Sequence, residues 1–111
     1  MRVLNMTMVA LLAASTGGAL ADGDDGKVLY EENCAKCHGI NAEGTDKGPP
    51  FLHAVYKPDH HGDRSFQRAV AMGSPAHHWP FGDMLPVPGL TVEDVTKITA
   101  YVRDLQREAG F

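Results

Sequence analysis

The chain has little with which to build a large apolar interior or to bind nucleic acid. It has 111 residues, one tryptophan, two cysteines, and a net charge of −4. No stripe of basic residues runs along it, which argues against nucleic acid as a partner. We find no internal repeat, no sustained alternation of apolar and polar residues, and no long apolar run after the first twenty residues. The sequence therefore predicts one small helical domain.

The first residues follow the pattern of a secretory signal. Arg2 supplies positive charge, residues 6–14 are apolar, and residues 19–21 read Ala-Leu-Ala, a small-residue cleavage site. The apolar run is too short to span a bilayer. We therefore expect a signal peptide at 1–21, a single domain at 22–111, and a periplasmic protein. Loss of Arg2 would change the net charge to −5.

The sequence pattern predicts three helices in this domain. After a polar lead-in, residues 26–39 form the first, with Asp24 or Asp25 as its cap. Residues 63–73 form the second, which stops at its final glycine. The loops between them, and before the last helix, contain most of the prolines. Something must order these long loops, and a large bound cofactor would also supply the missing core.

The last helix is the clearest, over residues 90–111. Thr91 and Asp94 make a capping-box pattern at its start. One apolar face is expected to pack on the rest of the domain, formed by Val92, Val95, Ile98, Thr99, Val102 and Leu105.

Both cysteines lie in the sequence CAKCH, residues 34–38. On a helix, Tyr30, Cys34, Cys37 and His38 would share one face. A zinc site would need more ligands, and adjacent histidines elsewhere rarely aim at one centre. A redox dithiol would need a preceding strand, and a disulfide would close almost no loop. Covalent attachment of haem explains all three residues, because each thiol adds to a vinyl group and His38 ligates the iron.

A second iron ligand is expected from methionine. Met72 ends the middle helix and is interpreted as a flexible core residue. Met84 lies in a proline-bound loop with no helix core to fill, so we expect Met84 to be the axial ligand opposite His38.

The chain resembles the class I c-type cytochromes over nearly all of residues 22–111. The resemblance is carried by Gly26 and Tyr30 before CAKCH, GPPFL after it, Met84, and ITAYVRDL in the last helix. It implies an all-α, small cytochrome c-like fold, with three to four helices and long loops around one covalently bound haem c.

The resemblance also implies particular contacts. The first helix should cross the last where Gly26 and Tyr30 meet Ile98 and Tyr101. The carbonyl of Pro49 should accept a hydrogen bond from the imidazole N–H of His38. Leu85 stands where a proline commonly follows the axial methionine. Further haem packing is expected from Tyr30, Leu52 and Trp79, with Phe81 beside it.

These features predict a soluble one-electron carrier rather than an enzyme. With both axial positions filled, the iron only cycles between two oxidation states. We expect a monomer with transient redox partners and a small docking interface. One alternative is a sensor or enzyme with a labile Met84.

A further alternative concerns the histidines outside CAKCH, which are His53, His60, His61, His77 and His78. They could be polar loop residues, a second axial ligand in place of Met84, or a surface metal site. A copper-binding module using these histidines and Met84 would leave the CAKCH sequence unexplained.

Overall fold

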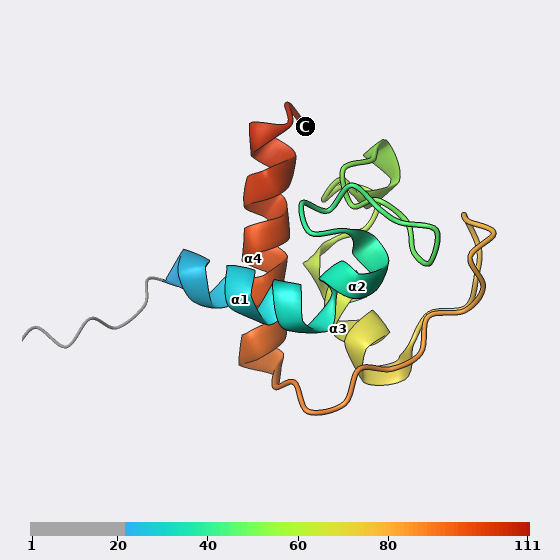
Figure 1. Ribbon diagram of the computed structural model, residues 1–111, viewed down its shortest axis with the longest axis horizontal. Helices are drawn as coiled ribbons and strands as arrows, with labels where there is room; N and C mark the ends of the chain where they lie inside the picture. The colour runs from blue at the N-terminus through green and yellow to red at the C-terminus, as the bar shows by residue number, and fades with distance from the viewer. Residues whose placement is uncertain (1–21) are drawn as a thin grey trace, which may run out of the picture.

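The computed structural model describes residues 22–111 (Figure 1). In this part of the chain, the helices are α1 (Asp22–Asn33), α2 (Ala35–His38), the 3-10 helix η1 (Ala54–Tyr56), α3 (Asp63–Met72) and α4 (Val92–Glu108). Residues 22–111 contain no strand, only one isolated bridge between Ser74 and Met84. The expected signal peptide at 1–21 lies outside the described residues. The all-α prediction is confirmed.

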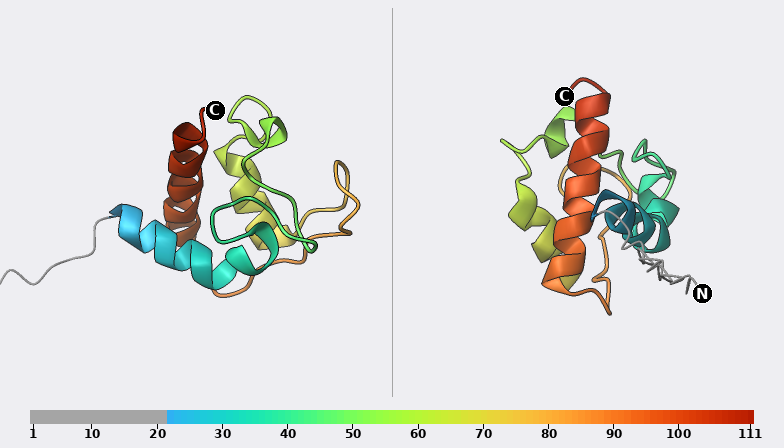
Figure 2. Two further views of the ribbon diagram at one scale, coloured as in Figure 1. Left: turned by 45° about the horizontal axis from the view of Figure 1, so that its top comes forward. Right: turned by 90° about the vertical axis from the view of Figure 1, so that its left-hand side faces the viewer.

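Helices α1 and α4 cross at close range, as Figures 1 and 2 show. A Cβ atom on Gly26 would lie 2.4 Å from the carbonyl oxygen of Lys97 and 3.2 Å from the Cβ of Tyr101. Only glycine allows the two backbones to approach this closely. The expected crossing of the first and last helices is therefore present.

The core lies where this crossing meets the loop after α2. Tyr30 and Val102 are completely buried, and Ile98 and Phe51 are nearly so. The ring of Tyr30 lies 5.5 Å from that of Tyr101 and 6.4 Å from that of Phe51. Its hydroxyl donates to the carbonyl of Gly39 at 2.7 Å. Tyr30 thus joins both long helices to the backbone just after His38.

Helix α4 begins as the sequence predicts. The hydroxyl of Thr91 accepts from the backbone N–H of Asp94, and the Asp94 carboxylate accepts from that of Thr91, both at 3.0 Å. The expected apolar face is buried from Val95 to Val102, but Val92 is 74% exposed. The placement of Val92 on this face was wrong, because at the first helical position it lies beyond the packed surface.

Two polar residues on α4 are buried that the apolar pattern did not predict. Arg103 donates to the carboxylate of Asp63 at 3.0 Å and to the carbonyl of His61 at 2.7 Å. Gln106 donates to the carbonyl of Phe51 at 3.0 Å. These side chains satisfy backbone carbonyls of the long loop, which would otherwise be buried without donors.

The first helix differs from its expected limits. It begins at Asp22, so Asp24 and Asp25 lie inside it rather than capping it, and the expected polar lead-in is helical. Carboxylates in the first turns of a helix interact favourably with its dipole. Lys97 of α4 also lies 3.4 Å from the Asp25 carboxylate. A turn at Cys34 separates α1 from α2.

Helix α3 agrees with its prediction, because it ends where Gly73 adopts a φ of +76°. Met72, however, is 69% exposed, so its interpretation as a core residue was wrong. Among residues 22–111, none of the helices has the length and apolar character needed to traverse a lipid bilayer.

Candidate functional site

The CAKCH turn presents its three chemical groups from one short element. Backbone hydrogen bonds link the His38 N–H to the Cys34 carbonyl at 2.9 Å and the Gly39 N–H to the Ala35 carbonyl at 2.8 Å. Cys37 is exposed and Cys34 is half-buried, and both thiols are free. Burial raises the pKa of the Cys34 thiol to about 11, and the neighbouring Cys37 adds to this effect.

The imidazole of His38 is buried and held in one orientation. Its Nδ1 lies 2.9 Å from the carbonyl oxygen of Pro49, the first of the two prolines in GPP. Since a carbonyl can only accept, Nδ1 is the donor and Nε2 carries the lone pair. The ring also stacks on Phe51, with centroids 4.1 Å apart. Burial lowers the pKa of His38, although the bond to Pro49 acts in the opposite direction. His38 is therefore kept neutral, with the lone pair of Nε2 available.

The loop that carries Pro49 is fastened to the same turn. The hydroxyl of Thr45 donates to the Cys37 carbonyl at 2.6 Å. A Cβ on Gly48 would lie 2.7 Å from that carbonyl oxygen. The carbonyl of Ala42 accepts from the N–H of Phe51 at 2.9 Å. These contacts bring Cys34, Cys37, His38 and Pro49 together, as the family resemblance implied.

Met84 enters from a different part of the fold. Its backbone pairs with that of Ser74 in both directions, at 2.8 and 2.9 Å. A Cβ on Gly73 would lie 2.4 Å from the Met84 carbonyl oxygen. Met84 is half-buried, whereas the next residue, Leu85, is 78% exposed. The structure thus attaches Met84 to the end of α3 rather than to the CAKCH turn.

The residues expected to pack on haem have different surroundings. Leu52 is partly buried against the core cluster, while Tyr30 lies within that cluster. Trp79 is half-buried, with its ring 4.9 Å from His53 and 6.2 Å from the exposed Phe81. The indole Nε1 of Trp79 is buried with no acceptor of normal geometry among residues 22–111.

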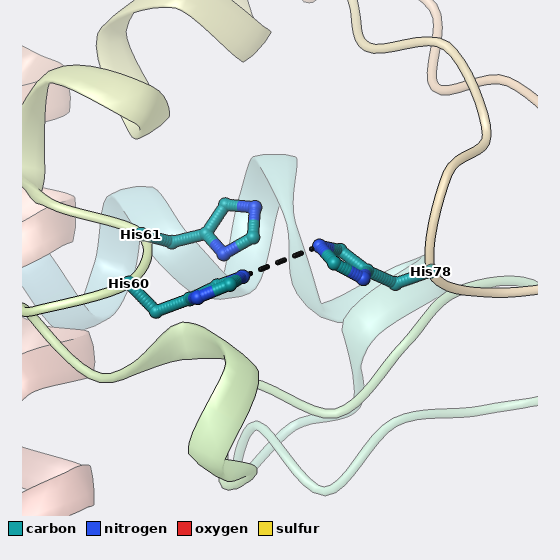
Figure 3. Close-up of side chains that lie close together, drawn as sticks. All are labelled: His60, His61 and His78. Atoms are coloured by element: carbon teal, nitrogen blue, oxygen red, sulfur yellow. Dashed lines mark hydrogen bonds between the residues drawn. The ribbon is translucent and has the colours of Figure 1, made fainter.

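Four histidines meet between the two long loops. Nε2 of His60 lies 3.4 Å from Nε2 of His78, and Nε2 of His61 lies 3.4 Å from Nε2 of His77. Figure 3 shows His60, His61 and His78 converging. Partial desolvation lowers the pKa of His78, as do His77, His61 and His60. Contrary to the expectation about adjacent histidines, His60 and His61 point into one centre. The repeated His-His pair is the sequence signal that could have indicated it.

Comparison with known proteins agrees with this geometry. The Cytochrome c family model matches residues 23–106. The chain therefore belongs to the cytochrome c family and is a class I c-type cytochrome, as the resemblance indicated. Such domains bind haem and transfer electrons. No match was found among curated proteins or solved structures.

Proposed function

We propose that this protein is a one-electron carrier with a single haem c, joined by thioether bonds to Cys34 and Cys37 and ligated by His38 and Met84. The hydrogen bond between His38 Nδ1 and the Pro49 carbonyl carries the proposal. This bond leaves Nε2 unprotonated and fixes the direction of its lone pair, which is what an axial ligand requires. When bound, haem supplies an iron that alternates between the ferrous and ferric states.

The chemistry of the donor set fits this cofactor. Two free thiols and one imidazole come from a single turn, and the neighbouring loop is already fastened around them. Among residues 22–111 the buried N–H of Trp79 has no acceptor of normal geometry, its nearest polar interaction being with the Tyr56 hydroxyl, and a haem propionate would provide an acceptor. Met84 would supply a thioether ligand, which favours the ferrous state. With His38, oriented by Pro49, it would tune the potential and leave the iron without an open site for substrates.

The setting follows from the same assignment. We propose a periplasmic monomer, released by removal of residues 1–21, that meets its redox partners transiently. The support is the signal pattern and the acidic balance of the chain, which favours partners with a positive docking patch.

Haem attachment can be tested directly. The protein is matured in a periplasmic expression host, denatured, and stained for haem on a gel. The wild type should stain, and a Cys34→Ala/Cys37→Ala variant should not. A colourless wild type with two thiols free for alkylation would refute the attachment.

The sixth ligand is tested by substitution and by carbon monoxide. Met84→Ala should change the spectrum of the ferrous and ferric forms and lower the potential, whereas Met72→Ala, at an exposed site, should change neither. Reduced wild type should not react with carbon monoxide at neutral pH, while Met84→Ala should. Rapid, complete reaction of the wild type would instead favour a sensor or enzyme with an open iron site. An unchanged spectrum in Met84→Ala would favour a histidine as the axial ligand.

A further inference from the structure

We define the histidine cluster as His60, His61, His77 and His78. Two of its ring nitrogens face each other as hydrogen-bond acceptors without a donor between them. Nδ1 of His61 lies 2.6 Å from the carbonyl of Val55, and Nδ1 of His77 lies 2.8 Å from the carbonyl of Pro75. Carbonyls only accept, so both Nδ1 atoms must be donors. In the neutral rings, both Nε2 atoms are then acceptors. These two acceptors face each other at 3.4 Å with no proton between them.

Such an arrangement calls for a cation between the two rings. Two facing lone pairs at this exposed contact repel each other. A metal ion at their meeting point would convert both lone pairs into ligand bonds. In His61 and His77, the second ring nitrogen already donates to a backbone carbonyl, which is the usual support for an imidazole ligand.

The spacing also suits one ion. Two nitrogens bound at 2.0–2.1 Å lie about 3.3 Å apart in the tetrahedral geometry of zinc and about 2.9 Å apart in the square-planar geometry typical of Cu²⁺. The pairs His61–His77 and His60–His78 are each separated by 3.4 Å. One ligand nitrogen from each of His60, His61 and His78 lies within 4.8 Å of the others, and Figure 3 shows these three rings facing one another from the two loops.

The backbone on both sides of the cluster is held independently of any ion. Arg103 donates to the carbonyl of His61 at 2.7 Å and fixes the first loop to α4. In the second loop, the Asp83 carboxylate accepts from the N–H of Ala76 at 2.8 Å, and the pairing of Ser74 with Met84 closes the base. The ligands are thus presented on fastened segments, which reduces the entropy lost on binding.

We propose that the histidine cluster binds one divalent transition-metal ion, with Cu²⁺ preferred over Zn²⁺. His60, His61 and His78 are assigned as ligands, with His77 as the fourth. Imidazole suits both ions, and the order of affinities for first-row metals places copper above zinc. The site contains only neutral imidazoles, so it does not select hard cations such as Mg²⁺ or Ca²⁺. This proposal does not depend on the haem assignment.

The test uses the mature, untagged, haem-containing protein in its ferric state, so that the haem does not reduce copper. After treatment with chelator, it is titrated with CuCl₂ and ZnCl₂ by calorimetry. We expect one ion per chain, with copper bound more tightly. Electron paramagnetic resonance of the copper form should show hyperfine splitting from several nitrogens. If neither copper nor zinc forms a one-to-one complex, the proposal is overturned, and a proton shared between two of the histidines would account for the cluster.

Variants assign the ligands. His78→Gln and His60→Gln lie at exposed positions and should each weaken copper binding by about tenfold or more, while the His60→Gln/His78→Gln double variant should lose the one-to-one complex. His53→Asn is the matched control, because it removes an imidazole outside the cluster and keeps a side-chain acceptor for the Val55 N–H. Equal affinity in the double variant, or an equal loss in His53→Asn, would refute the assignment. The haem spectrum of each variant reports separately on the haem site.

Discussion

A single hydrogen atom in place of a side chain decides how closely the first and last helices pack. The Gly26 position has no room for a methyl group, since the Lys97 carbonyl oxygen would be 2.4 Å away. We predict that Gly26→Ala lowers the free energy of unfolding by about 1–3 kcal/mol, because the helices must separate. Urea denaturation of the haem-bound protein measures this.

The matched control for this substitution is Gly62→Ser. A Cβ at Gly62 meets only the Pro58 carbonyl oxygen at 3.5 Å, and serine is a good residue at this N-cap of α3. Its stability should change by less than about 0.5 kcal/mol. A similar loss in both variants would mean that close packing at Gly26 is not the cause.

Tyr30 is the residue that connects the helix crossing to the CAKCH turn. Its buried hydroxyl donates to the Gly39 carbonyl, and burial raises its pKa above the ordinary value. Tyr30→Phe should cost about 0.5–1.5 kcal/mol, because the Gly39 carbonyl loses the Tyr30 hydroxyl and keeps only the Ala42 N–H as a donor. Tyr101→Phe is the comparison, since no hydrogen bond of its hydroxyl is found within residues 22–111. If chemical denaturation gives the same change for both, the hydrogen bond contributes nothing specific.

Among the elements, α4 depends most clearly on its first turn. The hydrogen bonds from Thr91 lower the pKa of Asp94 from its usual value of 3.8. The folded state therefore holds this proton less tightly than the unfolded state, so the contribution of Asp94 is complete well above pH 3.8 and is lost as the pH falls below that value.

Thr91→Ala should lower stability at neutral pH by about 1 kcal/mol, whereas Thr91→Ser, which keeps a hydroxyl, should lose much less. The alanine variant keeps the backbone N–H of residue 91, which is the larger cause of the lowered pKa of Asp94, and removes only the contribution of the hydroxyl, so its stability should fall slightly less steeply than that of the wild type in acid. Thermal unfolding between pH 7 and pH 3 checks both effects. An identical acid slope in the two proteins would contradict this account.

The elements also show what sequence patterns can and cannot predict. Helices α3 and α4 were predicted because their stop and capping signals are local, at Gly73 and at Thr91 with Asp94. The start of α1 was missed, since its packing on α4 and the ion pair between Asp25 and Lys97 join distant segments. Within the candidate site, the two cysteines and His38 are neighbours in the sequence, so their proximity could be predicted from CAKCH alone. The meeting of His60 and His61 with His77 and His78 depends on the positions of two loops, which no local pattern contains.

At the scale of the whole molecule, Arg103 connects α4 to the start of α3 and to the long loop before it. From α4, its guanidinium reaches Asp63 at the start of α3 and the carbonyls of His61 and Tyr56, and it lies over the ring of Phe66. Lysine has a single ammonium group and cannot reproduce this planar set of donors.

We predict that Arg103→Lys lowers the free energy of unfolding by about 1–3 kcal/mol, because the His61 carbonyl loses its Arg103 donor, whereas the Tyr56 carbonyl keeps Gln106. Arg107→Lys, at an exposed position on the same helix, should be nearly neutral. The two variants are compared by urea titration of the haem-bound form, and a loss of similar size in both would show that helix propensity, not this network, is responsible.

The crossing of α1 and α4 also governs the order in which this chain can mature. Each helix is short enough to be marginal on its own in water, and their contact spans most of the domain, so closing it carries a large entropic cost. A nascent chain without its last seventeen-residue helix therefore cannot bury Tyr30. Until that helix is present, Cys34 and Cys37 lie on a segment without its tertiary support, and in the completed fold Cys34 becomes half-buried while Cys37 stays exposed.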